Sequence, residues 1–208
     1  MNTTEAKEYL TKAGEQLLDA VSKQDSDAVR MLLTQGADIE TRDSNGRTAL
    51  LLATYHNAIE VARLLIDAGA DVNAMDNITD SPYLYAGAEG RLEILRMTLE
   101  YGADLSSINR YGGTALIPAA HHGHIQTVAE LLQTDLDIDH VNDPGWTALL
   151  EAIILGDGGP VYIEIVRLLI DAGADVSLPD SNNVSPMVHA TERGYTEIVK
   201  LLGVADSF

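Results

Sequence analysis

Three histidines in one short segment are the first side chains whose types and spacing could support chemistry. His121, His122 and His124 lie in the segment HHGH, and imidazole nitrogens are common zinc ligands. His121 and His122 are adjacent in sequence, so on a helix they would point about 100° apart and could not easily share one ion. We therefore expect no metal site here.

Two further segments begin like ligand-binding loops. DLDIDHVND (135–143) resembles the start of a calcium loop, but His140 stands at the central glycine position and Trp146 where a bidentate Glu should be. GDGGP (156–160) is glycine-rich, like a phosphate-binding loop. Such a loop needs a strand before it and a G-K-[ST] ending, whereas here a helix is expected before it and Val161 follows. Neither segment predicts a bound ligand.

Motifs for catalysis are not found in the sequence. G-x-S-x-G, H-E-x-x-H and the dinucleotide fingerprint are absent, and there is no cysteine to act as a nucleophile. Glu89 and Glu151 could share a groove and act as acid and base. Nothing in the sequence indicates the desolvation that would tune such a pair. We expect no enzymatic activity and no cofactor.

Charge and hydropathy exclude two classes of partner. The 208 residues include 32 acids and 13 bases, a net charge of −19 that would repel nucleic acid. No apolar run is long enough for membrane insertion. The N-terminal segment MNTTEAKEYLTKAG lacks the features of a signal peptide. We expect a cytoplasmic protein, or an exported one if a signal peptide was removed before Met1.

The most specific feature of the sequence is an internal repeat. LLIDAGADV occurs twice without change, at 64–72 and 168–176, with weaker copies at 31–39, 97–105 and 130–138. The polar residue that opens each following unit recurs after 33, 33, 33 and 38 residues; these residues are Asp43, Asp76, Asn109, Asn142 and Asp180.

This period is that of the ankyrin repeat, and the sequence resembles the ankyrin family over roughly residues 14 to 202. The family's T-P-L signature reads as TAL or as Ser-Pro at 48–50, 81–83, 114–116, 147–149 and 185–187, and its A-x-x-G-H turn as AHHGH at 120–124. The resemblance implies an all-α repeat solenoid in one domain, 1–208. It would have six units including terminal caps, each a pair of short helices with a β-hairpin-like finger. The units would span about 14–42, 43–75, 76–108, 109–141, 142–179 with an inserted loop at 158–162, and 180–208.

Each recurrent residue has a predicted structural role. Hydroxyl side chains are expected to cap the first helix of a unit; these are Thr48, Ser81, Thr114, Thr147 and Ser185. Pro82 and Pro186 would occupy the first helical position. Residues that tolerate a left-handed conformation are expected to end that helix; these are Asn57, Gly90, Gly123, Gly156 and Gly194. Asp135 replaces a glycine of the other units and predicts a local distortion.

The longer interval of 38 residues indicates an insertion of five residues, about Gly158 to Tyr162. It is expected to lengthen the turn between the two helices of its unit. The segment AIILGDGGP is similar to an insertion in small bacterial ankyrin proteins. Ile154 and Leu155 fall where other units mostly have polar residues. They are expected to be covered by the inserted loop; the alternative is an exposed patch for a partner.

The resemblance also implies where a partner would bind, because ankyrin proteins usually contact ligands through a groove of finger tips and inner helices. Tyr85, Tyr111, His121, His122 and Trp146 are expected to be neighbours at its centre. Tyr, Trp and Arg dominate binding hot spots. An alternative for Trp146 is that its ring only packs against Tyr111. The full set of candidate binding residues is Arg47, Tyr55, His56, Tyr85, Glu89, Arg110, Tyr111, His121, His122, Trp146, Glu151, Ile154 and Leu155.

We therefore predict a monomeric, non-enzymatic module that binds an unidentified protein. A basic partner surface would suit the acidic charge, although 13 of the 32 acids fall at scaffold positions of the repeat. The alternative function is a small-ligand or cation sensor that uses the acidic, His-containing groove.

Overall fold

The computed structural model describes residues 3–205, and side chains from Lys12 onward. These residues form helices joined by turns, with one isolated β-bridge between Arg42 and Thr48. The helices are α1 (Thr3–Ser22), α2 (Ser26–Thr34), α3 (Ala49–Tyr55), α4 (Ile59–Asp67), α5 (Pro82–Ala88), α6 (Leu92–Glu100), α7 (Leu116–His121), α8 (Ile125–Leu131), α9 (Ala148–Ile154), α10 (Pro160–Asp171), α11 (Pro186–Glu192) and α12 (Thr196–Ala205). The expected all-α repeat architecture is confirmed.

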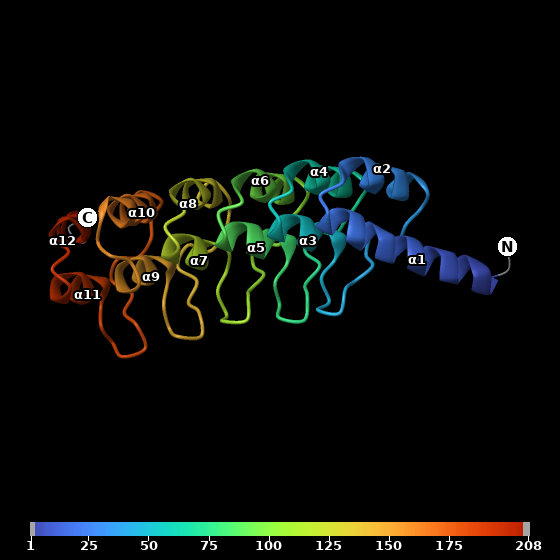
Figure 1. The fold of residues 1–208 in the computed structure, drawn as a ribbon. Coiled ribbons are helices and arrows are strands. Elements are labelled where there is room, and N and C mark those ends of the chain that lie inside the picture. The colour runs from blue at the N-terminus through green and yellow to red at the C-terminus, as the bar shows by residue number, and fades with distance from the viewer. Residues whose placement is uncertain (1–2, 206–208) are drawn as a thin grey trace. The chain divides into compact units, whose positions relative to one another are not determined.

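The helices belong to two compact units, each of which contains several repeats. The N-terminal unit comprises Met1–Ala86 and Arg91–Asp104, and the C-terminal unit comprises Gly87–Gly90 and Leu105–Phe208, so the division passes through α5. In the N-terminal unit, α2 packs against α4 and α4 against α6, while α1 packs against α3. Figure 1 shows that the loops before α3 and α5 project beyond the row that holds α3.

The C-terminal unit repeats the same arrangement. Each inner helix pairs with the outer helix that follows it: α7 with α8, α9 with α10, and α11 with α12. Inner helices also pack against inner helices, and outer against outer, as Figure 1 shows for α7, α9 and α11. Alanines on the inner helices, such as Ala119, Ala152 and Ala190, are fully buried. Their small side chains allow this close approach, so the core is shared between neighbouring repeats.

Four of the five predicted helix caps are present. The hydroxyl oxygens of Thr48, Ser81, Thr147 and Ser185 each accept a hydrogen bond from the backbone N–H three residues later, at 3.1–3.4 Å. Pro82 and Pro186 begin α5 and α11, as expected.

The prediction for Thr114 is wrong, because its buried Oγ1 has no hydrogen-bond partner among the described residues. Ile117 N, which would be its donor, bonds instead to the Thr114 carbonyl oxygen at 3.3 Å. The helix α7 accordingly begins later, at Leu116.

The insertion lengthens a helix rather than only a turn, which corrects the prediction. The α10 helix has 12 residues and begins at Pro160, whereas α2, α4 and α6 have nine each. Proline at the first helical position is favourable because its missing N–H would be unpaired there in any case. Pro160–Tyr162 therefore form an extra first turn of α10.

The insertion also moves the left-handed residue that ends the inner helix. Asn57, Gly90, Gly123 and Gly194 have positive φ as predicted, but in the fifth repeat the left-handed glycine of this turn is Gly158, with φ of 69°, and not Gly156. Gly156 is instead buried against the ring of Tyr162, where a β-carbon would overlap that ring.

Two tyrosines tie neighbouring repeats together at this point. Tyr162 donates a hydrogen bond from its hydroxyl to His121 O at 2.8 Å, and Tyr195 donates one to Gly156 O at 2.9 Å. Each bond joins a residue at or just before the start of an outer helix to a residue at or just after the end of the inner helix of the preceding repeat. We call them the inter-repeat tyrosine bonds.

The distortion predicted at Asp135 is visible in the preceding helix. The α8 helix has seven residues and ends at Leu131, and Thr134 N then donates to Leu131 O at 3.0 Å in a tight turn.

Candidate functional site

The candidate binding residues of the N-terminal unit surround a pair of stacked tyrosines. The ring centroids of Tyr55 on α3 and Tyr85 on α5 are 3.9 Å apart, with planes 17° from parallel. The Arg47 guanidinium lies 5.4 Å from the Tyr55 ring centroid and forms an ion pair with Asp43 at 2.6 Å. Such a cation–π contact orders the arginine.

The hydroxyl of Tyr55 is fixed by a hydrogen bond to a neighbouring carboxylate. It donates to Asp80 Oδ2 at 3.1 Å, and burial together with the Asp80 carboxylate raises the pKa of Tyr55 above its usual value. The phenol therefore stays protonated and acts as a hydrogen-bond donor. His56, the fourth candidate of this unit, is exposed and is the C-cap residue that follows α3.

The fingers of the C-terminal unit display Tyr111 and Trp146. Tyr111 is 57% exposed, and the Arg110 guanidinium lies 4.8 Å from the centroid of its ring. Trp146 is half-buried, and among the described residues no ring contact joins it to Tyr111. The fingers are linked through the backbone instead, since Asp143 N donates to Tyr111 O at 2.9 Å. That Trp146 packs on Tyr111 stays an alternative.

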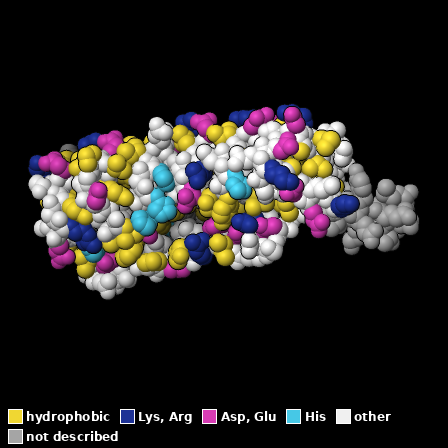
Figure 2. All heavy atoms as spheres, in the orientation of Figure 1, with side chains coloured by type: hydrophobic (Ala, Val, Ile, Leu, Met, Phe, Trp, Pro, Cys, Tyr) yellow, Lys and Arg dark blue, Asp and Glu magenta, His cyan; other side chains and the backbone are white. Residues whose placement is uncertain are grey.

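The histidines gather at the end of α7, as the space-filling view shows (Figure 2). The ring centroids of His121 and His122 are 4.7 Å apart. His122 Nδ1 lies 2.7 Å from Ala88 O, so this nitrogen carries a proton, and in the neutral ring Nε2 is an acceptor. Within the described part of the chain, no group of three or more His, Asp or Glu residues is arranged to hold a metal ion.

Beside these histidines, Glu151 on α9 is buried, with 8% of the residue exposed. Its Oε1 accepts a hydrogen bond from Asn142 Nδ2 at 2.7 Å, and its Oε2 lies 3.6 Å from His121 Nδ1. Burial raises the pKa of Glu151 to about 6, although the Asn142 hydrogen bond acts in the opposite direction. The desolvation that the sequence did not indicate is thus present for Glu151.

The orientation of Asn142 is determined by its neighbours. Asn142 Oδ1 accepts a hydrogen bond from Trp146 N at 2.9 Å, so the other end of the amide must donate to Glu151. A continuous chain of polar contacts therefore runs from the finger at Trp146 through Asn142 and Glu151 to His121. Burial and the neighbouring His122 lower the pKa of His121, which favours the neutral ring.

The remaining candidates are placed separately. Tyr85 lies in the N-terminal unit, whereas Tyr111, His121, His122 and Trp146 lie in the C-terminal unit, so it stays a prediction that all five are neighbours. Glu89 is half-buried and is not among the contacts of Glu151.

The cover predicted for the two aliphatic residues after α9 is only partial. Ile154 is half-buried, whereas Leu155 is 42% exposed. The prediction that the inserted loop covers both is wrong for Leu155, because Tyr162 turns toward Gly156 and the His121 carbonyl instead.

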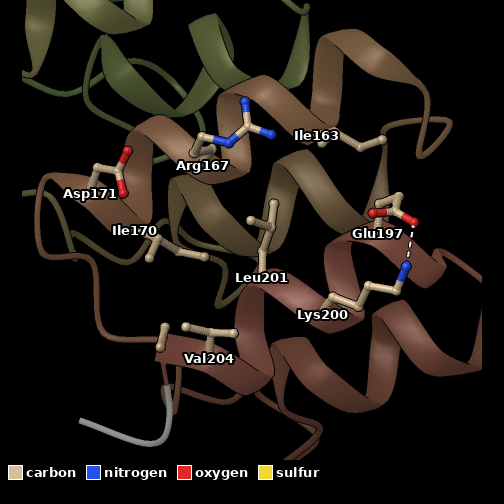
Figure 3. A pocket seen from close by; sticks show the side chains of 9 residues that line it. Ile163, Arg167, Ile170, Asp171, Glu197, Lys200, Leu201 and Val204 are labelled. Atoms are coloured by element: carbon tan, nitrogen blue, oxygen red, sulfur yellow. Dashed lines mark hydrogen bonds and ion pairs between the residues drawn. The ribbon is translucent and has the colours of Figure 1, made fainter.

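Two concavities in the C-terminal unit were not predicted from the sequence. One, of about 310 Å³, lies between the turn that follows α7 and the insertion. It is lined by His122, Gly123, Asp157, Gly159, Pro160, Val161 and Tyr162. The other, of about 410 Å³, lies between α10 and α12 (Figure 3). Its lining combines the aliphatic residues Ile163, Ile170, Leu201 and Val204 with the charged residues Arg167, Asp171, Glu197 and Lys200. Val204 is 63% exposed.

Among the helices of residues 3–205, none combines the length and the apolar composition needed to cross a membrane.

Comparisons with known proteins agree with this architecture. The family model described as "Ankyrin repeats (3 copies)" matches residues 17–109 and 83–180. An ankyrin repeat domain from Acinetobacter baumannii AYE, solved as a crystal structure, is 56% identical, with a TM-score of 0.90 over 91% of this chain and 97% of that chain. EF0377, an ankyrin repeat protein, is 46% identical, with a TM-score of 0.89 over the same shares.

A relative with lower sequence identity has the same fold. The ankyrin repeat domain of Bcl-3, described as a member of the IkappaB protein family, is 28% identical with a TM-score of 0.82, over 91% of this chain and 85% of that one. The ankyrin repeat protein YahD of Escherichia coli (strain K12) is 46% identical over 52 residues, so the match spans about a quarter of each protein, 25% and 26%. The chain belongs to the ankyrin repeat family, whose members generally serve as protein-binding scaffolds rather than as enzymes.

Proposed function

We propose that this protein binds another protein, without catalysis, through side chains on its fingers and inner helices. In the N-terminal unit these are Arg47, Tyr55, His56 and Tyr85. In the C-terminal unit they are Glu89, Arg110, Tyr111, His121, His122, Trp146, Glu151, Ile154 and Leu155.

The observation that carries the proposal is the exposed Tyr111 beside Arg110. A tyrosine that is 57% exposed at a finger, with a guanidinium 4.8 Å from its ring centroid, combines the two residue types that are enriched in binding hot spots. An exposed aromatic ring gains contact area when a partner covers it, at a low cost in side-chain entropy.

The finger that carries Tyr111 is already ordered by its surroundings. Asn109 Oδ1 accepts from Tyr111 N at 2.9 Å and from Gly113 N at 3.1 Å. His140 Nε2 lies 2.7 Å from Gly112 O and ties the finger to the next one. Because the loop is fixed in advance, little conformational entropy is lost when a partner binds.

The test is an affinity capture from a lysate of the source organism with three baits. These are the unmodified protein, a Tyr111→Ala/Trp146→Ala variant, and a Tyr101→Ala control. Tyr101 is a similarly exposed tyrosine (48%), but it caps the outer helix α6. Circular dichroism confirms beforehand that all three are folded.

We expect a protein that is captured by the unmodified chain and by the Tyr101→Ala control to be lost with the double variant. Identical captures by all three baits would reject the finger surface. A parallel Tyr55→Ala/Tyr85→Ala bait tests the surface of the N-terminal unit separately.

A further inference from the structure

Glu151 is a buried carboxylate that is not paired with a lysine or an arginine. Its side chain is 10% exposed, and its contacts are the amide of Asn142 and the imidazole of His121 at 3.6 Å. Among the described residues, no lysine or arginine pairs with it. Taking a carboxylate out of water without a cation nearby is unfavourable. Such groups are often kept because a ligand uses them.

Two other repeats pair their opening aspartate with a basic side chain. The residue that opens the second repeat, Asp43, is paired with Arg47 at 2.6 Å. In the sixth repeat, Asp180 accepts a hydrogen bond from His189 Nε2 at 3.0 Å. The fifth repeat uses the same two positions as the sixth, but with donor and acceptor exchanged, since Asn142 donates and Glu151 accepts. The exchange leaves the carboxylate on the inner helix with an uncharged partner.

The surrounding sequence adds negative charge and no lysine or arginine. Residues 111–166 contain eight acids and four histidines, and neither of these two bases. The nearest such residues in sequence are Arg110 and Arg167, which flank the segment on either side. A cation that reaches Glu151 from a partner therefore meets no competing lysine or arginine from this segment. The long-range field also favours its approach.

The burial of Glu151 favours a cation that is carried on a long, flexible stem, because its side chain is only 10% exposed. Glu151 Oε1 already accepts the Asn142 hydrogen bond, whereas Oε2 has His121 Nδ1 beside it at 3.6 Å, so Oε2 is the oxygen with more capacity for a further donor. His121, whose side chain is 39% exposed, stands beside Oε2 at the surface. A flexible aliphatic stem can carry a charged group past this ring, and a guanidinium can also stack on it.

We propose that Glu151 binds the charged end of a lysine or arginine side chain from the protein partner, with Asn142 and His121 positioning the carboxylate. The proposal rests on the proposed function, because the basic side chain belongs to the protein bound at the finger surface. It assigns Glu151 as the anchor for a basic segment, beside the aromatic contacts of Tyr111 and Trp146.

The experiment measures binding of fluorescein-labelled oligo-arginine and oligo-lysine peptides, with a neutral Gly-Ser peptide of equal length. Binding is measured at about 0.15 M salt, where exposed charges are screened beyond about 8 Å. The test variant is Glu151→Gln, in which the side-chain oxygen can still accept the Asn142 hydrogen bond. The control is Glu192→Gln, an exposed glutamate of the inner helix α11.

We expect Glu151→Gln to weaken binding of the better cationic peptide by about tenfold, since it removes one partner of a buried charge pair. Glu192→Gln should change it by less than about twofold. The indole N–H resonance of Trp146, the only tryptophan, should shift when the peptide binds the unmodified protein. Tighter binding of the oligo-arginine peptide would indicate that the site prefers a guanidinium, and tighter binding of the oligo-lysine peptide that it prefers an ammonium group.

Protonation gives a second readout. The titratable groups that act on Glu151 are His121, the last residue of α7, and His122, which follows it. Because the pKa of Glu151 is raised to about 6, peptide affinity should fall as the pH is lowered from about 7 to about 5. The fall should be smaller in Glu151→Gln, which retains the same histidines.

The inference is overturned if Glu151→Gln binds cationic peptides as tightly as the unmodified protein, or if their binding leaves the Trp146 resonance in place. The capture assay separates this failure from that of the proposed function. A partner that is lost with Tyr111→Ala/Trp146→Ala but kept with Glu151→Gln would reject the role of Glu151 and retain the finger surface. A partner kept by both variants would reject the finger surface itself.

Discussion

Replacing Glu151 by glutamine should make the protein more stable at neutral pH. Burial raises the pKa of this carboxyl from 4.5 to about 6, which means that the folded chain disfavours the charged form. A shift of this size corresponds to about 2 kcal/mol as an upper limit. Glutamine removes the charge while its side-chain oxygen can still accept the Asn142 hydrogen bond.

The sign of the pH dependence follows from the direction of the shift. Between pH 4.5 and about 6, the folded state binds more protons at Glu151 than the unfolded state does. The free energy of unfolding contributed by this group therefore falls as the pH rises through that window, and it is constant above it. The advantage of Glu151→Gln should be absent at the acidic end and fully developed near pH 7. His121 is present in both proteins, so only the part of its contribution that depends on the charge of Glu151 remains in the difference.

The assay is urea denaturation, followed by far-UV circular dichroism and by Trp146 fluorescence, at a series of pH values between about 4.5 and 7.5. Thermal melts should show a higher midpoint near neutral pH, by about 2–4 °C for each kcal/mol in a chain of this size. Glu192→Gln serves as the exposed control and should give no such trend. A Glu151→Gln variant that is less stable than the parent at neutral pH would refute the reasoning. It would mean that the charged contacts with Asn142 and His121 outweigh the desolvation.

Two paired substitutions test the local corrections to the fold. Gly158→Ala should destabilise the chain by about 1–3 kcal/mol, because φ of Gly158 is 69° and a β-carbon would overlap the ring of Tyr195. Gly36→Ala is the control: φ of Gly36 is 80°, but a β-carbon there would meet open space, so the substitution should cost about 1 kcal/mol. Equal losses in thermal melts would argue against the overlap. Thr114→Val should be neutral or stabilising by up to about 1 kcal/mol, since the buried hydroxyl of Thr114 is unpaired among the described residues. Thr147→Val should cost about 1 kcal/mol, because it removes the hydroxyl that accepts the capping hydrogen bond from Leu150 N. Similar losses in urea denaturation for both threonines would show that Thr114 is a functioning cap.

The sequence predicted the repeat architecture well because each repeat reuses the same residue types for the same task. A hydroxyl such as Thr48 or Thr147 caps each inner helix through contacts within three residues, and such local interactions can be read from a pattern. Thr114 fails because its expected donor turns to the backbone carbonyl instead, which is a matter of helix geometry. A residue type predicts the capacity for a bond and not its formation.

The insertion was predicted less well because its conformation is decided by residues far away in sequence. Of the glycines in GDGGP, it is Gly158 that takes the left-handed conformation, since Gly156 is packed against Tyr162. Pro160 is a local signal for the start of a helix, because proline is favourable at the first helical position. The length of the insertion alone does not reveal this helix start. The pKa of Glu151 likewise depends on burial between α7 and α9, which no pattern within α9 reveals.

The inter-repeat tyrosine bonds have a consequence for how the C-terminal unit would come apart under load. Tyr195 fastens the last repeat to Gly156, and Tyr162 fastens the fifth repeat to His121. A force applied at the C-terminal end reaches the Tyr195 bond first, and the Tyr162 bond only after the last repeat has peeled away. The insertion lies between Gly156 and Tyr162, which both take part in these bonds. The added residues are therefore held at both ends and do not form a loose loop between the repeats.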